Sequence, residues 1–252
     1  MTLEGADVDP PLHFPMSGSS EVLPDLPCIK YVGSFEELVS TRFAGQVNAL
    51  CWRRQLPGDY GEIVRKLQVE RGITTIEEED LNALSLSPEG QVAREILLQD
   101  QAMLLEYGLL PVLDCINGYV NHDQDGPMST HVQSFHVDSA TVEADTYLCT
   151  YYGLSSEGLS NGGARRRADD PETRAELLKL YGGEDDGGFQ EFLNENFFDL
   201  HYTPLPQARP WSFGIGNLWR ITCEYPGSPV PPCIHRAPDT VPGQPPRLLL
   251  IS

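Results

Sequence analysis

The stretch FHVDSATVEADTYLCTYYG, which begins at Phe135, places a histidine and an aspartate two residues apart, just ahead of a strand-like run. Residues i and i+2 of a strand face the same side, so His136 and Asp138 can direct an imidazole and a carboxylate at one point in space. Such a pair is half of many metal sites and part of some acid–base sites. The alternative is an exposed pair without a metal, because a chain with 6 His and 37 acidic residues contains this spacing by chance.

A second histidine and an arginine follow near the end of the sequence. The segment PPCIHRAPDTVPGQPPRLLLIS contains His235 and then Arg247, which opens the last apolar strand. Two histidines and one carboxylate form the facial triad of non-haem Fe(II) oxygenases, which leaves coordination positions open for substrate and dioxygen. A guanidinium beyond the distal histidine suits a co-substrate carboxylate, which it binds through two parallel hydrogen bonds.

Each of these residues has an alternative role that the sequence leaves open. His235 lies among proline and apolar residues, where a buried histidine bonded to a backbone carbonyl is the simpler interpretation. Arg247 can pair with one of the many acidic residues, and Arg236, beside the distal histidine, is a competing contact for an anion. His131 lies an odd number of residues before His136 and is expected on the other face of the strand.

Other motifs carry weaker signals. The segment NHDQDG, which contains His122, lacks the full spacing and the terminal glutamate of a calcium loop. The basic segment GGARRRADD is expected to be a solvated loop or the entry to a helix, with anion binding as the alternative. The tryptophans are expected in the core or in a pocket wall, and they are Trp52, Trp211 and Trp219.

Composition narrows the classes of function. Lys and Arg number 17 and Asp and Glu 37, which gives a formal charge of −20 that repels nucleic acid and anionic membranes. No apolar run reaches the length of a membrane span, and the acidic N-terminus lacks the pattern of a signal peptide. The 6 cysteines lie far apart without a C-x-x-C motif, which predicts reduced, mostly buried thiols in a cytoplasmic protein.

Capping residues predict helices in the N-terminal half, which must support the candidate site. Ser34, Asp59 and Ser87 each precede a helical pattern. Gly72 is the predicted end of the second of these helices and Gly108 of the third. The apolar stripe of the third helix is predicted to consist of Val92, Ile96, Met103 and Tyr107.

Short strands separated by Pro and Gly replace this pattern after about residue 111. One further helix is predicted there, between a cap at Asp170 and a stop at Gly182. The 23 Gly and 21 Pro favour a turn-rich β architecture. We expect a flexible arm over residues 1–27 and a single domain over residues 28–252, mainly β with helical additions.

The order H-x-D…H…R resembles that of the 2-oxoglutarate-dependent Fe(II) dioxygenases, whose fold is a double-stranded β-helix, a cupin-like jelly roll. Three stretches, VNALCWRR, FHVD…YLCTYYG and IHRAP…RLLLIS, resemble still more closely the bacterial family known as domain of unknown function 1826. They occur in family order and bracket roughly residues 45–252. The resemblance implies that His136, Asp138 and His235 hold Fe(II).

The same resemblance implies roles for residues around the metal. Arg247 would pair with the distal carboxylate of 2-oxoglutarate, and Tyr147 or Tyr151 would add a hydroxyl to the pocket. The implied reaction couples oxidative decarboxylation of the keto acid to attack on a C–H bond of an unknown small molecule. Two alternatives stay open. One is a metal-binding, cupin-like protein without oxygenase activity, linked to metal homeostasis. The other is a zinc hydrolase that uses the same three ligands and an activated water.

Overall fold

The computed structural model describes residues 24–119, 126–239 and 243–252. Most of the arm predicted over residues 1–27 lies outside the described residues, as does His122 of the rejected calcium loop. At the described end of the arm, Leu26 and Cys28 already pack against buried side chains of the domain.

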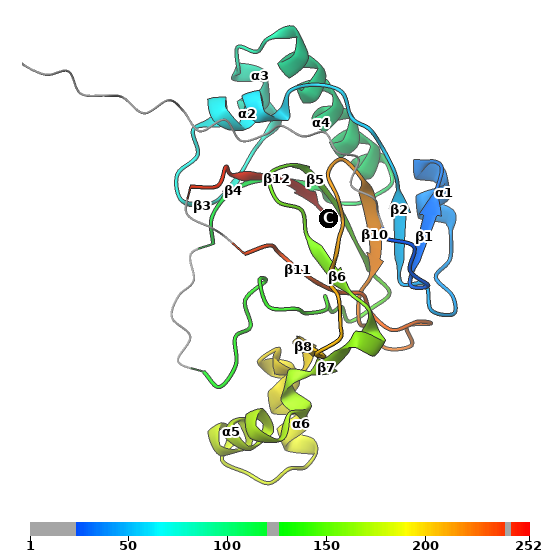
Figure 1. Cartoon of the computed structure of the whole chain (residues 1–252), viewed down its shortest axis with the longest axis vertical. Helices are drawn as coiled ribbons and strands as arrows, with labels where there is room; N and C mark the ends of the chain where they lie inside the picture. Colours follow the sequence, from blue (N-terminus) through cyan, green and yellow to red (C-terminus); the bar gives the residue numbers. More distant parts are fainter. Residues whose placement is uncertain (1–23, 120–125, 240–242) are drawn as a thin grey trace, which may run out of the picture.

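The described chain is a mixed α and β structure in which sheets form the centre and helices lie outside them (Figure 1). The strands are β1 (Ile29–Val32), β2 (Ala49–Trp52), β3 (Gly72–Thr75), β4 (Val112–Asn117), β5 (Asp145–Tyr152), β6 (Glu157–Leu159), β7 (Ala164–Arg166), β8 (Tyr202–Pro204), β9 (Trp211–Ser212), β10 (Leu218–Thr222), β11 (Ile234–Arg236) and β12 (Arg247–Ile251). The α-helices are α1 (Phe35–Ser40), α2 (Tyr60–Leu67), α3 (Glu78–Ala83), α4 (Pro88–Glu106), α5 (Pro171–Tyr181) and α6 (Gly187–Glu195). Short 3-10 helices are η1 (Asn161–Gly163), η2 (Arg167–Asp169) and η3 (Phe198–Leu200).

The larger sheet contains seven strands in the order β1-β2-β10-β5-β12-β4-β3 and is antiparallel except for the β1–β2 pair. A smaller sheet has the order β11-β6-β9, and β7 pairs with β8. Isolated bridges join these smaller sheets, because His136 pairs with His235 of β11 on one side and with His201, just before β8, on the other. The segment around His136 therefore makes the smaller sheets into one layer.

Two cores lie on opposite faces of the larger sheet. The outer one is covered by α2, α3 and α4, which lie above the sheet in Figure 1. The inner one fills the space between the larger sheet and the β11-β6-β9 layer. Three aromatic side chains form its centre, with ring centroids 4.5 Å apart for Trp211–Phe213 and 4.7 Å apart for Phe213–Trp219. The candidate metal ligands lie in the layer that closes this inner core.

The predicted helix starts are confirmed by side-chain caps. The side chains of Ser34, Asp59, Ser87 and Asp170 each accept a hydrogen bond from a backbone N–H in the first turn of α1, α2, α4 and α5. The predicted stop at Gly72 is wrong. Helix α2 ends at Leu67, where Gln68 adopts a left-handed conformation with φ 48°, and Gly72 begins β3 instead.

The predicted apolar stripe of α4 is displaced from the buried one. Val92 is 38% exposed and Tyr107 is 49% exposed, whereas Leu97 and Leu104 are buried. The buried residues of the helix are Gly90, Ala93, Leu97, Asp100 and Leu104. Asp100 lies within this buried stripe and interrupts its apolar pattern, so the sequence pattern predicted the adjacent face of the helix instead. Its carboxylate is buried because Arg54 Nη1 lies 2.7 Å away.

The six cysteines are free thiols, as predicted, and five of them are buried. Among the helices of the described residues, none is long and apolar enough to span a bilayer.

Candidate metal centre

The structure brings together the three residues that the sequence singled out as metal ligands. One candidate ligand atom from each of His136, Asp138 and His235 lies within 4.8 Å of the others. His136 Nε2 lies 3.9 Å from one carboxylate oxygen of Asp138, and His235 Nε2 lies 3.7 Å from the other. Two imidazoles and one carboxylate therefore converge, although His235 is far from the other two residues in the sequence.

Backbone pairing accounts for this convergence. His136 and His235 exchange two hydrogen bonds, with N···O distances of 2.8 and 2.9 Å. Residues that are directly opposed on neighbouring strands project their side chains from the same face, and so does the residue two positions along. Asp138 is that residue, and its carbonyl accepts a hydrogen bond from the backbone N–H of Glu224 over 2.7 Å.

Both imidazoles are oriented by the backbone of their own strands. His136 Nδ1 lies 2.7 Å from the carbonyl oxygen of Ser134, and His235 Nδ1 lies 3.2 Å from that of Cys233. A carbonyl can only accept, so each Nδ1 donates its proton to this bond and Nε2 keeps its lone pair. Histidines that bind metals are typically fixed in this manner, with the second nitrogen bonded to a carbonyl.

Asp138 is held by a residue of the opposite sheet. Thr146 of β5 donates its hydroxyl proton to Asp138 Oδ2 over 2.5 Å. Burial raises the pKa of Asp138, but the facing His235, the Thr146 hydrogen bond and His136 together lower it below its usual value. The carboxylate is therefore ionised at neutral pH, which is the form that binds a cation.

Burial sets the charge of His136. It lowers the pKa of this imidazole to about 4, and the neighbouring His235 acts in the same direction. The ring is therefore neutral at pH 7, as a metal ligand must be. Borderline nitrogen donors and a hard carboxylate oxygen suit Fe(II) and also Zn(II), so the residues present fit either metal.

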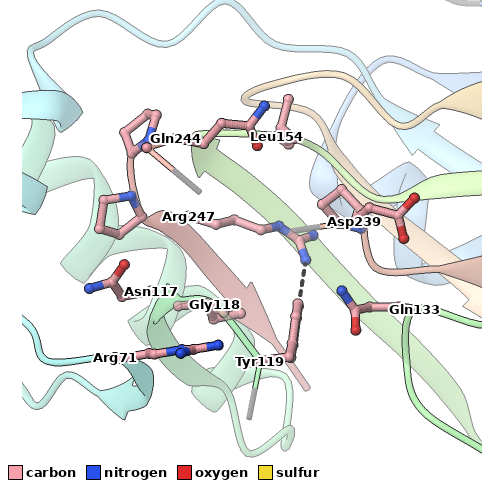
Figure 2. A pocket seen from close by; sticks show the side chains of 14 residues that line it. Arg71, Asn117, Gly118, Tyr119, Gln133, Leu154, Asp239, Gln244 and Arg247 are labelled. Atoms are coloured by element: carbon pink, nitrogen blue, oxygen red, sulfur yellow. Dashed lines mark hydrogen bonds between the residues drawn. The ribbon is translucent and has the colours of Figure 1, made fainter. Parts of the chain in front are cut away.

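Arg247 enters the space between the sheets from the first position of β12. Only 5% of its surface is exposed. Its Nη2 donates to the hydroxyl oxygens of Thr150 at 3.0 Å and Ser156 at 2.6 Å. Its Nη1 donates to the hydroxyl of Tyr119 at 3.4 Å (Figure 2). Among the described residues no carboxylate contacts this guanidinium, and its buried Nε has no partner.

A cavity of about 510 Å³ lies beside this guanidinium. Figure 2 shows the Arg247 side chain extended into it, with Gln133 and Asp239 at the far side. Asp239 is directed to Arg236, 3.8 Å away, and its side chain is 70% exposed. The polar residues of the lining are Arg71, Asn117, Tyr119, Gln133, Asp239, Gln244 and Arg247.

The cavity and the metal ligands share structural segments. Gln133 belongs to the segment that carries His136, and Asp239 follows the strand that carries His235. Ser156, which contacts Arg247, lies two residues before Gly158, and Gly158 pairs with His235. Two residues of a strand span about 7 Å. The contact of Arg247 with Ser156 therefore lies about 7 Å along the chain from Gly158, the residue opposite His235.

Tyr147 and Tyr151 do not belong to this pocket, and the prediction that they do is wrong. They alternate along β5 with Thr146 and Thr150, so they face the outer core under the helices. The hydroxyl of Tyr151 donates to Asp100 Oδ2 over 2.5 Å beneath α4. The residues of β5 that face the site are the threonines, which the sequence analysis did not identify.

Arg236 also lies on the opposite face from the metal ligands. It follows His235 directly in β11, so its side chain projects to the other side of the layer. Its Nε and Nη2 both donate to one carboxylate oxygen of Glu157, at 2.7 and 2.6 Å, and its guanidinium lies 4.7 Å from the ring centroid of Phe135. Arg236 is therefore no competing contact for an anion beside the metal.

The sequence analysis also missed a histidine beside the site. His201 pairs with His136 across the layer, and their ring centroids lie 5.7 Å apart. It is only 4% exposed, but it lies in a segment without strand alternation, so no local pattern indicates it. His131, by contrast, contributes no atom to the group of candidate ligands.

No family model, curated protein or solved structure matches the chain. The geometry of the site is therefore the basis of the functional argument.

Proposed function

We propose that this protein is an Fe(II)- and 2-oxoglutarate-dependent oxygenase that acts on a small molecule. The observation that carries the proposal is Arg247, a buried guanidinium without a carboxylate partner in the described residues, beside a cavity. A buried charge is costly unless it is paired, so a ligand carboxylate is the natural complement. The His136–Asp138–His235 group lies on the facing layer, where the keto end of such a ligand would reach a metal.

The strand pairing supports a double-stranded β-helix, which this type of oxygenase uses. Four neighbouring strands of the larger sheet, in the order β4-β12-β5-β10, face a layer in the order His136 segment-β11-β6-β9. From β4 to β12 the chain passes from one layer to the other at each step, except between β6 and β9. A jelly roll has this alternation of strands between two sheets. Strands β1, β2 and β3 then extend the larger sheet at its edges.

In this proposal each residue has a defined task. His136, Asp138 and His235 would hold the metal on one face, which leaves other coordination positions open. Bound iron and 2-oxoglutarate supply the oxidation chemistry. Arg247 binds the distal carboxylate, and the hydroxyls of Thr150 and Ser156 keep its guanidinium in place.

The test is an anaerobic titration of the Fe(II)-loaded protein with 2-oxoglutarate, followed by the weak visible charge-transfer band of the complex. We expect the wild type to develop the band. Arg247→Lys keeps the charge but loses the planar, two-pronged donor, so it should retain the metal and bind the keto acid about 10-fold more weakly or worse.

Arg236→Lys is the matched control, because Arg236 lies on the outer face and already pairs with Glu157. It should leave keto-acid affinity unchanged. Absence of the band in the wild type, with zinc retained through purification, would favour the zinc hydrolase or the non-catalytic metal-binding protein. Equal affinities in the wild type and the Arg247→Lys variant would remove Arg247 from the co-substrate site.

A further inference from the structure

Two residues continue the row of metal-binding histidines across the layer. His235 pairs with His136, His136 pairs with His201, and the backbone N–H of Arg167 donates to the carbonyl of His201 over 2.8 Å. The β7–β8 register, in which Arg166 pairs with Tyr202, also places Arg167 opposite His201. Because opposed residues project from the same face, the side chains of this row all start on the side of the metal site.

The spacing of strands places Arg167 within reach of a ligand at the metal. Neighbouring strands are about 4.8 Å apart, so the backbone of Arg167 lies about 10 Å from that of His136. An arginine side chain and a small molecule can bridge this distance. Arg247 contacts the same layer at Ser156, just before β6. Strand β6 pairs with β11 on the side of His235 that faces away from His136. The candidate metal ligands therefore lie between the two arginines.

The three arginines of the basic segment have different surroundings. Arg165 forms an ion pair with Asp170, and Arg166, on the outer face, forms a side-chain hydrogen bond with Tyr202. The Arg167 side chain is half-buried, yet in the described ranges of the chain it has no ion pair and no hydrogen bond. Of these three cations, Arg167 is the one left for a ligand anion.

His201 provides a second, independent observation at the same place. The residue is 4% exposed, and its Nδ1 is buried without a hydrogen-bond partner among the described residues. An imidazole nitrogen can form a hydrogen bond, and a buried polar atom without a partner is uncommon in folded proteins.

We propose that the substrate carries a carboxylate or a phosphate, that Arg167 binds this anion, and that His201 hydrogen-bonds the adjoining part of the substrate. This inference rests on the proposed function, because it assigns the substrate to the side of the metal opposite the Arg247 cavity. The formal charge of −20 repels anions in general, so an anionic substrate needs a local cation at its binding site.

The experiment uses pairs of small probes that share a carbon skeleton and differ in charge. The full chain is loaded with Mn(II), which prevents turnover, and saturated with 2-oxoglutarate so that the Arg247 site is filled. Thermal stabilisation is then measured with glycerol against glycerol 3-phosphate and with propionamide against propionate. We expect saturable stabilisation by the anionic member of one pair only, which also decides between phosphate and carboxylate.

Two variants assign the effect to its residue. Arg167→Gln should weaken binding of the effective anion about tenfold, as expected for loss of a charged hydrogen bond. Arg165→Gln removes an equal charge two positions away, where the side chain pairs with Asp170, and should leave the affinity unchanged. Equal stabilisation by charged and neutral probes, no stabilisation by any probe, or equal weakening in both variants, would overturn the inference.

Failure of the proposed function is recognised separately. Binding of Mn(II) and of 2-oxoglutarate is measured without any probe. A wild-type protein that binds neither overturns the proposed function and this inference with it. A protein that binds both, but whose anion affinity does not depend on Arg167, overturns this inference alone.

Discussion

Thr146→Val tests whether the bond between the two sheets prepares Asp138 for metal binding. Valine has nearly the shape of threonine but cannot donate to Asp138 Oδ2, the acceptor of the Thr146 hydroxyl at 2.5 Å. The carboxylate would lose its fixed orientation and one of the interactions that lower its pKa. We therefore expect weaker metal binding without loss of the fold.

The expected magnitude follows from the exposure of Asp138. A hydrogen bond to a charged group contributes about 1.5–3 kcal/mol. The Asp138 side chain is 32% exposed, so water replaces part of the lost bond and the lower end of this range applies. A loss of about 1.5 kcal/mol corresponds to metal affinity roughly tenfold weaker at pH 7. The difference should grow as the pH falls, because protons compete better for a carboxylate whose pKa has risen.

The assay is a competition for Co(II) or Zn(II) between the protein and a chromophoric chelator, at pH 7 and again at pH 5.5. Urea unfolding of the metal-free protein gives the change in stability of the same variants. Thr222→Val is the matched control. Thr222 is 2% exposed, and its hydroxyl donates to the carbonyls of Asn48 and Pro231 rather than to a metal ligand.

Both substitutions should cost about 1 kcal/mol of stability, since each removes one buried hydroxyl. Only Thr146→Val should weaken metal binding. Unchanged metal affinity in Thr146→Val, or equal losses in the two variants, would show that Thr146 does not prepare the metal centre.

His235→Ala should abolish stoichiometric binding of Fe(II) or Zn(II), measured by metal analysis after dialysis, whereas His131→Ala should not, because His131 is outside the group of candidate ligands. In the metal-free protein, burial lowers the pKa values of His136 and His201 from 6.5 to about 4. Between pH 6.5 and pH 4 the unfolded chain therefore binds more protons than the folded one, so the free energy of unfolding decreases as the pH falls through this window. The loss has an upper limit of about 3 kcal/mol for each histidine. The urea midpoint should fall less between pH 7 and pH 5 in His201→Gln than in the wild type, and an equal fall would refute the lowered pKa of His201. Leu97→Ala should lower the free energy of unfolding by about 2–5 kcal/mol, and Val92→Ala by less than about 1 kcal/mol, because Leu97 is 1% exposed and Val92 is 38% exposed. Urea denaturation measures both, and the reverse order would favour the apolar stripe predicted from the sequence.

Features that depend on neighbours in the chain could be predicted from the sequence. The caps at Ser34, Asp59, Ser87 and Asp170 join residues no more than three positions apart, so the local pattern was sufficient. The shared face of His136 and Asp138 follows from strand geometry alone. The reduced cysteines follow from their spacing and apolar surroundings.

Other features depended on which distant segments meet. Alternation along β5 separates Tyr147 from Thr146, but only the packing of helices on one face decides which of them faces the site. Burial of Asp100 needs Arg54, and the apolar pattern of α4 could not indicate an ion pair from another element.

The candidate metal site was decided by pairing between strands that are remote in the sequence. His201 and Arg167 join the row of His136 and His235 through backbone hydrogen bonds across the layer, which leave no trace in local residue patterns. Whether Arg247 meets a carboxylate is likewise a property of the assembled sheets, since its Nη2 contacts are the hydroxyls of Thr150 and Ser156, which are remote in the sequence. Local sequence determines which side chains share a face, whereas the tertiary structure decides what that face meets and therefore the partners, the charge, the burial and the chemistry of each side chain.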